Sequence, residues 1–168
     1  EYYYQYPALV DSILYRASVH GFQGQYWGTD LSWFVTERGD SPYDDQWAAH
    51  TEIQATKYQV RGVVMHLGRD AGVNPVVLQG TPEYAAVAKL YTILVGTKPA
   101  DLGVGINSGP TGSVSYRLTH PTSVSYGFAH PNGDKSFTLW LNDAAVDDDP
   151  GEKTTLTFPG MSASRVTG

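Results

Sequence analysis

The sequence contains no cysteine, which excludes disulfides, thiolate metal sites and cysteine nucleophiles together. That absence suits the cytoplasm or a bacterial secreted protein and does not choose between them. The opening residues 1–6 are acidic and rich in tyrosine, so no signal peptide is visible, although a mature secreted chain looks the same after cleavage. We keep the localisation open and favour secretion.

Positive charge and long apolar runs are also scarce. The chain has 11 Lys and Arg against 17 Asp and Glu, and the net charge of −6 argues against nucleic-acid partners. No run of about 18 apolar residues is present, so no membrane partner is expected. Gly103, Gly105 and Gly109 lack the strand-to-helix setting of a dinucleotide site. A G-x-S-x-G nucleophile motif is also missing. We expect neither a cofactor nor a metal.

The composition that remains is globular. Hydrophobic residues make up 41% and charged residues 17% of the 168 residues, which is enough for one ordinary domain or two very small ones. The pattern changes near residue 100, from helical periodicity with short extended runs to short alternating strands. The sequence therefore predicts a segment 1–100 and a second segment 101–168.

Segment 1–100 predicts helices that alternate with two strands. A helix begins at Pro7 and is closed by Gly21. A second opens with a capping box from Thr51 to Gln54, and a third begins at Thr81. The expected strands are residues 25–33 and 73–79. The order helix, strand, helix, strand, helix is typical of βα units with a parallel sheet. Two strands cannot close a barrel, which needs eight.

Segment 101–168 predicts an antiparallel β-sandwich of about five strands. Four runs alternate apolar and polar residues, namely 113–118, 123–129, 136–141 and 154–158. Asn132 and Gly133 predict a type I′ hairpin turn between two of them, because that turn needs two residues with positive φ. Residues 147–151 predict a further turn, and the strands are expected to follow one another as a meander.

Several runs, taken in order, resemble the end of a clan A glycoside hydrolase. Residues 20–33 (HGFQGQYWGTDLSW) are similar to strand seven of its (β/α)8 barrel, and residues 50–68 (HTEIQATKYQVRGVVMHLG) resemble the helix that follows. VNPVVLQG resembles strand eight and YAAVAKLYTILVGTKP the eighth helix. Residues 125–160 are similar to the β-sandwich appended to several such enzymes. The resemblance implies partial (β/α) barrel units followed by that sandwich.

The resemblance also implies a mechanism. Retaining enzymes of this clan use two carboxylates about 5 Å apart, a nucleophile and an acid/base. The nucleophile position at the end of strand seven matches Asp30, where the family has Glu. Glu37, in a second Thr-Glu pair, is the counterpart if the strand is read in another register. The acid/base belongs to strand four, upstream of residue 1. Activity therefore needs a second carboxylate from Glu37, Glu52 or a neighbouring subunit.

Each candidate carboxylate also has a purely structural interpretation. Asp30 can be a turn residue that caps its own backbone. Glu37 can be an exposed loop charge, and Glu52 suits the first turn of a helix because of the macrodipole. The three aspartates of residues 147–149 can bind Ca²⁺ or form a solvated turn, and such runs are usually turns.

The candidate substrate-binding residues are mostly aromatic. Trp27, Trp33 and Tyr26 can form a platform for a pyranose ring, and Gln79 follows the second predicted strand. The alternative is that alternate residues of the strand are buried, so that at least one of the two tryptophans belongs to the core.

We therefore predict glycoside hydrolysis of a β-linked plant oligosaccharide or polysaccharide, or a remnant of that activity. The rival functions are a carbohydrate-binding module without catalysis and a fragment that serves assembly. Because a truncated barrel exposes unpaired strand edges, we also predict a homo-oligomer in which a second copy closes the sheet.

Overall fold

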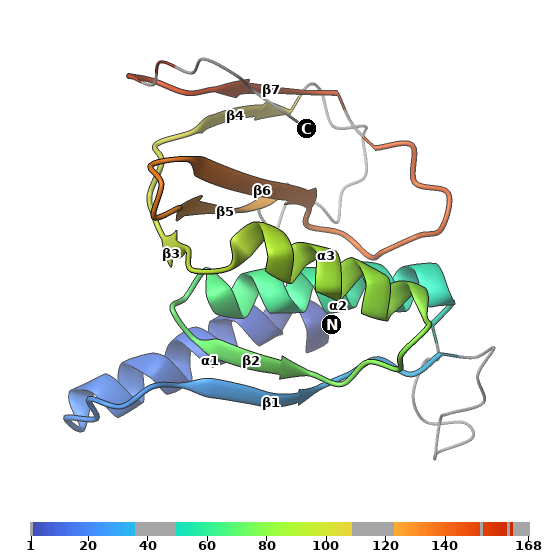
Figure 1. The fold of residues 1–168 in the computed structure, drawn as a ribbon, viewed down its shortest axis with the longest axis horizontal. Coiled ribbons are helices and arrows are strands. Elements are labelled where there is room, and N and C mark those ends of the chain that lie inside the picture. Colours follow the sequence, from blue (N-terminus) through green and yellow to red (C-terminus); the bar gives the residue numbers. More distant parts are fainter. Residues whose placement is uncertain (1, 36–49, 109–122, 152, 161, 163–168) are drawn as a thin grey trace.

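The fold was analysed on a computed structural model that describes residues 2–35, 50–108, 123–151, 153–160 and 162. Figure 1 shows these residues stacked in layers. A parallel two-stranded sheet lies on one side, helices lie in the middle, and two antiparallel sheets follow on the other side.

The first hundred residues have the order of elements that the sequence predicts. The chain runs through α1 (Tyr2–Val19), β1 (Trp27–Leu31), α2 (Glu52–Leu67), β2 (Gly72–Pro75) and α3 (Pro82–Leu94). β1 and β2 pair in parallel, and α2 connects them. This is a βαβ unit followed by a helix, and among the described residues no third strand pairs with either outer edge of its two-stranded sheet.

Two predicted helix caps are present in the structure. The Thr51 hydroxyl accepts a hydrogen bond from the Gln54 N–H at 3.2 Å, and the Gln54 side chain accepts one from the Thr51 N–H at 3.3 Å. These two bonds are the predicted capping box of α2. Gly21, with a φ of 78°, follows the end of α1 in the left-handed conformation that glycine favours.

Two element boundaries near proline residues differ from the prediction. α1 begins at Tyr2 and continues through Pro7, whereas the sequence predicted Pro7 in the first turn. A proline removes one N–H from the helix, which interrupts a single hydrogen bond and leaves both sides helical. β2 ends at Pro75, so the predicted strand 73–79 is shorter than its apolar run.

The second half forms two small antiparallel sheets. Its strands are β3 (Lys98–Pro99), β4 (Gly105–Ser108), β5 (Ser123–Ala129), β6 (Lys135–Leu141) and β7 (Thr154–Thr157). One sheet has the order β3-β5-β6, and the other pairs β4 with β7. The predicted meander is therefore wrong, because β7 pairs with β4 and not with β6. The predicted strand 113–118 lies outside the described residues.

The hairpin between β5 and β6 uses a different turn from the one predicted. The His130 carbonyl accepts from the Gly133 N–H at 3.0 Å, which makes Pro131 and Asn132 the central residues. Only Gly133 in this turn has a positive φ, of 90°. Pro131 holds a negative φ at the first central position, so a type I′ turn is impossible there.

The main buried cluster lies between the helices and the β5–β6 sheet. Val64 of α2, Leu94 of α3 and Phe128 of β5 are buried together. Partly buried side chains pack around them, namely Leu67, Leu90, Tyr126 and Trp140. One side of α2 therefore contributes to this cluster, while Gly28 and Leu31 of β1 approach another side, at His66 and Gly62.

Polar contacts along α2 hold the connection that follows β6. The Ala145 N–H donates to the Tyr58 hydroxyl at 2.9 Å, Arg61 donates to the Asp143 carbonyl at 2.9 Å, and the Thr51 hydroxyl donates to Asp147 at 2.6 Å. These bonds span most of the length of the helix. The segment after residue 100 is thus anchored on the same helix that connects β1 to β2.

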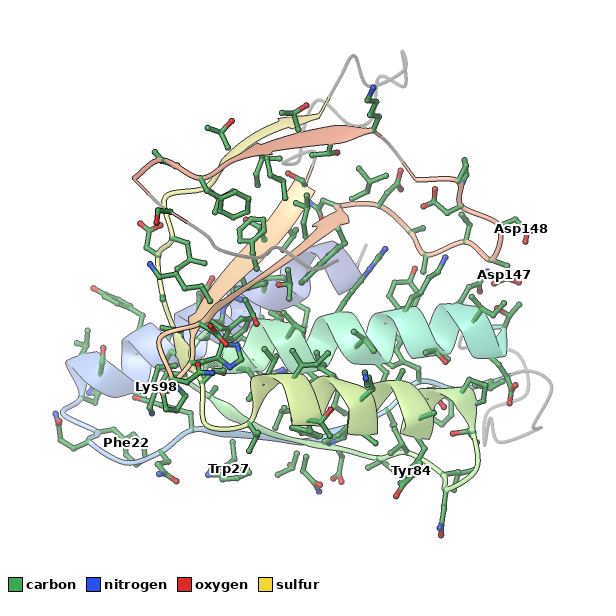
Figure 2. The ribbon with its side chains drawn as sticks, turned by 45° about the horizontal axis from the view of Figure 1, so that its top comes forward. Phe22, Trp27, Tyr84, Lys98, Asp147 and Asp148 are labelled. Carbon is green, nitrogen blue, oxygen red and sulfur yellow. The ribbon has the colours of Figure 1, made fainter. Side chains whose placement is uncertain are left out.

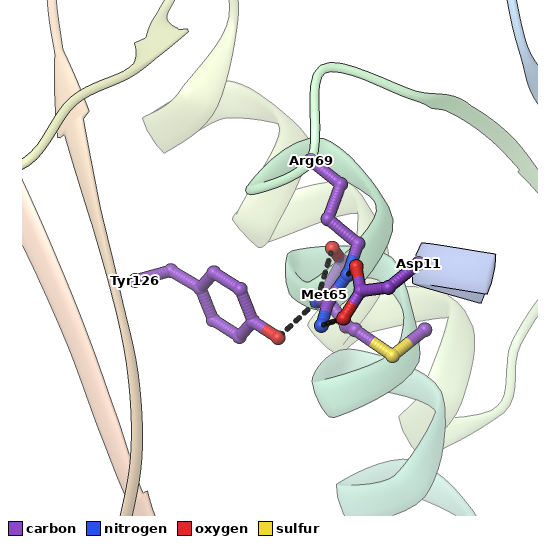
Figure 3. Close-up of polar contacts among 4 residues, drawn as sticks. All are labelled: Asp11, Met65, Arg69 and Tyr126. Atoms are coloured by element: carbon purple, nitrogen blue, oxygen red, sulfur yellow. Dashed lines mark hydrogen bonds and ion pairs between the residues drawn. The ribbon is translucent and has the colours of Figure 1, made fainter. Parts of the chain in front are cut away.

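Arg69, just beyond α2, joins three elements (Figure 3). Its guanidinium contacts the Asp11 carboxylate of α1, with nitrogen–oxygen distances of 2.5 and 3.0 Å. It also donates to the Met65 carbonyl at 3.3 Å and to the Tyr126 hydroxyl on β5. Although burial opposes it, Asp11 and Tyr126 leave the pKa of Arg69 raised, so the group stays charged.

Candidate functional site

The carboxyl ends of β1 and β2 lie at one edge of the parallel sheet, where α2 and α3 begin (Figure 1). In parallel α/β folds, ligand sites gather outside this edge. Asp30 is the next-to-last residue of β1 and is exposed there. Its φ is 57°, in the left-handed region that residues with a Cβ atom rarely adopt.

A β-bulge creates this conformation. Gly28 pairs with Val73 and Leu31 pairs with Pro75, so two residues of β1 face one residue of β2. Such bulges redirect side chains and are common beside active sites. The left-handed conformation costs about 1–2 kcal/mol for a residue other than glycine. The end of β1 therefore presents a carboxylate on a strained piece of backbone.

Gln59 of α2, which the sequence did not single out, lies directly behind the bulge. Its side chain is completely buried, and its Nε2 donates to the Leu31 carbonyl at 2.8 Å. The Val76 N–H donates to the same carbonyl, also at 2.8 Å. The signal in the sequence was a glutamine on the buried face of α2, between Ala55 and Val63.

Apolar side chains are exposed on β1 and just beyond the end of β2. Trp27 is 63% exposed, and Val76 and Leu78 are 50% and 55% exposed. The Trp27 ring packs against Gly72. A Cβ atom added at residue 72 would lie 2.6 Å from the nearest ring atom, so only glycine leaves room for the ring. Figure 2 shows Trp27 on the side of the sheet opposite to α2 and α3. We call the exposed side chains of Trp27, Val76 and Leu78 the open face.

Trp27 and Asp30 lie at different ends of β1. They are three positions apart in the sequence, which is about 10 Å along a strand. A ligand that contacts both must therefore extend along the strand.

Trp33 does not lie on the open face. Its ring stacks on Tyr58 of α2 at a centroid distance of 4.8 Å and meets the edge of His50 at 5.6 Å. Burial lowers the pKa of His50. Trp33 thus packs behind the carboxyl end of β1, and the structure does not bring it together with Trp27.

The remaining candidates are spread over several positions. The Tyr26 ring is half-buried against the edge of Phe22, at 5.1 Å, and its carbonyl accepts from the Gly72 N–H. Gln79 is exposed beyond β2. Glu37 lies outside the described residues. Glu52 is the first residue of α2, at the same edge of the sheet as Asp30.

A buried histidine lies behind the amino half of β1. His66 Nδ1 donates to the Gly62 carbonyl at 2.8 Å, so the neutral ring accepts through Nε2 from the Tyr6 hydroxyl at 3.3 Å. Burial lowers the pKa of His66, and the charge of Arg69 lowers it further. Gly28 makes room for the ring, since a Cβ atom there would lie 2.6 Å from Nε2.

A pocket of about 370 Å³ lies in the second half of the chain, away from the predicted site residues. It is bounded by the end of α2 at Gly68, by the connection 99–104, and by residues 125–127 of β5. Its lining combines glycines and small side chains with the larger Leu102, Tyr126 and Phe137. Asp101 is the one carboxylate among the described residues that line it, and it already accepts from the Gly103 N–H.

Two of the three aspartates of residues 147–149 accept hydrogen bonds. Asp147 accepts from Thr51, and Asp149 accepts from the Gly151 N–H at 2.8 Å. Among the described residues, no group of three or more His, Asp or Glu side chains is placed to hold a metal ion. In the same part of the chain, no helix has the length and apolar character needed to cross a bilayer.

Comparison of the chain with protein-family models, with curated proteins and with solved structures gives no match.

Proposed function

We propose that this chain takes part in the hydrolysis of β-linked glycosides, with Asp30 in the position of the nucleophile. The observation that carries the proposal is the conformation of Asp30, an exposed carboxylate with a φ of 57° at the carboxyl end of a parallel strand. Strained backbone of this kind persists where surrounding contacts impose it, and it concentrates at functional sites. The resemblance of residues 20–33 to strand seven of clan A enzymes supports the same residue.

The chemistry is that of a retaining enzyme. The Asp30 carboxylate attacks the anomeric carbon, the bond to the leaving-group oxygen breaks, and a glycosyl ester forms. Water then hydrolyses the ester. Glu52, at the same edge of the sheet, is the described candidate for the acid that protonates the leaving group, and a neighbouring subunit is the alternative source.

The test is hydrolysis of a panel of aryl glycosides and β-glucans by the purified chain. Asp30→Asn is the diagnostic variant, because it keeps the shape of the side chain and removes the nucleophilic charge. Glu37→Gln and Glu52→Gln are the companions. We expect turnover that Asp30→Asn abolishes, by about 10⁴-fold or more. Turnover that survives in Asp30→Asn contradicts the assignment, and loss in Glu37→Gln alone transfers it to Glu37.

A second candidate function is carbohydrate binding without catalysis. The observation that favours it is the open face, where the Trp27 side chain is exposed. Aromatic side chains provide a large apolar surface on which a pyranose ring can pack. Under this function Trp27→Ala abolishes glycan binding and Asp30→Asn leaves it unchanged. Calorimetric titration with the same β-glucans measures both effects and separates the two functions.

A further inference from the structure

Gln59 is a buried polar residue with an incomplete set of partners. Its amide nitrogen is bonded to the Leu31 carbonyl, whereas its Oε1 has no hydrogen-bond partner among the described residues. A buried polar atom without a partner costs stability. An apolar side chain of similar length would fill the same space without that cost. The bond to Leu31 is therefore the feature of Gln59 that needs an explanation.

The acceptor of that bond lies immediately after the strained residue. Leu31 ends the bulge, and its carbonyl receives two donors, Gln59 Nε2 and the Val76 N–H, each at 2.8 Å. These donors come from α2 and from the chain beyond β2. Together they fix the peptide between Leu31 and Ser32, one residue beyond Asp30, and so they hold the end of the bulge from which the backbone of Asp30 continues.

We propose that Gln59 is a positioning residue, which holds the bulge of β1 and thereby sets the direction of the Asp30 carboxylate. This inference rests on the proposed function for its catalytic consequence, but its structural part can be measured without any substrate. Gln59 itself contacts no substrate, since its side chain is completely buried. Its effect passes through the Leu31 peptide to Asp30.

The experiment compares Gln59→Met with Gln59→Glu in the full chain. Methionine keeps the length of the side chain and removes the donor. A buried glutamic acid has a raised pKa, and while protonated it donates its O–H to the Leu31 carbonyl. Val64→Ala is the matched control, because Val64 is a buried residue of the same helix that packs toward Phe128 and not toward β1.

The first readout is hydrogen exchange of the Val76 amide, which bonds to the same carbonyl. We expect exchange to become about tenfold faster in Gln59→Met than in Val64→Ala. The Leu31 carbonyl, which accepts from the Val76 amide, is then no longer held in place by a second donor. Gln59→Glu restores protection at acidic pH and loses it as the carboxyl ionises. The inference is overturned if Val76 exchanges at an unchanged rate in Gln59→Met. It is also overturned if the protection factor of the Val76 amide in Gln59→Glu does not change with pH.

The second readout is hydrolysis of aryl glycosides. We expect Gln59→Met to lower kcat by roughly 100-fold with KM unchanged, because a misdirected nucleophile affects the chemical step and not binding. Val64→Ala retains kcat. An equal loss of kcat in both variants overturns the positioning role. If the parent chain hydrolyses nothing, the proposed function fails, and the exchange measurement still decides whether Gln59 holds the bulge.

Discussion

Asp30 has a left-handed backbone conformation and a carboxylate side chain, and substitutions can change one without the other. Asn and Gly tolerate this left-handed φ better than other residues. Glycine has no Cβ atom, and the short polar side chain of Asn can hydrogen-bond to the nearby backbone. We expect Asp30→Asn to retain the stability of the parent, Asp30→Gly to match or exceed it, and Asp30→Ala to lose about 1 kcal/mol. Urea unfolding measures all three. A more stable Asp30→Ala variant would show that the bulge is not strained.

His66 predicts how stability depends on pH. Its pKa is lowered in the folded protein by burial, so the unfolded chain binds a proton more readily. The contribution of His66 to the free energy of unfolding is therefore complete above the pKa of an unperturbed histidine, about 6.5, and decreases as the pH falls below it. We expect His66→Gln to flatten this dependence in part, because the pKa of His50 is lowered too. His20→Gln, at an exposed position, is the matched control for the substitution itself.

Sequence patterns singled out residues by their neighbours along the chain. They missed residues that matter through contacts with distant parts of the chain. Asp30 and Trp27 stood out because of their neighbours in a strand-like run. Gln59 did not, because its importance comes from a carbonyl 28 positions away. Trp33 resembled a ligand platform in the sequence, and only the position of Tyr58 on α2 explains why its ring is covered.

At the level of elements, Arg69 is the main polar connection between α1, α2 and β5. Its side chain is 15% exposed and its guanidinium has partners on all three elements. We expect Arg69→Met to lower the free energy of unfolding by about 2 kcal/mol, because it leaves Asp11, Tyr126 and the Met65 carbonyl without their donor. Arg69→Lys recovers part of this loss, since one ammonium cannot reproduce the geometry of the guanidinium.

The contribution of the ion pair itself can be measured with Asp11. The Asp11 side chain is 56% exposed, so solvent screens the pair and Asp11→Asn alone should cost less than 1 kcal/mol. A double-mutant cycle in urea isolates the interaction. A cost for Asp11→Asn as large as that for Arg69→Met would contradict the view that Tyr126 and Met65 share the guanidinium.

Helices were easier to predict than sheet pairing. The capping box at Thr51 and the cap at Gly21 depend on residues a few positions apart, and both are present. The pairing of β4 with β7 joins residues about 50 positions apart, and no local pattern encodes it. The hairpin after β5 was located correctly, but Pro131 selected a turn that the Asn-Gly pair alone did not predict.

For the whole molecule, the open face and the outer edges of the β1–β2 sheet, which pair with no other described strand, predict self-association. Exposed strand edges and apolar sheet faces are normally covered in stable proteins. We expect a concentration-dependent oligomer that Val76→Lys weakens by placing a charge on the open face. Lys135, at the start of β6 on the far side of the helices, offers a control in Lys135→Gln. Light scattering that finds a monodisperse monomer at all concentrations would contradict the prediction.

The central claim is that Asp30 attacks a glycoside, and one measurement tests it without a complete catalytic pair. A dinitrophenyl 2-deoxy-2-fluoroglycoside has a leaving group that needs no acid, so a nucleophile alone can react with it and form a long-lived ester. The account predicts release of dinitrophenolate up to one equivalent per chain, with the sugar located on Asp30 by fragment mass spectrometry and absent from Asp30→Asn. A sugar attached to another residue, or no release from the parent chain across the panel of glycosides, would contradict it.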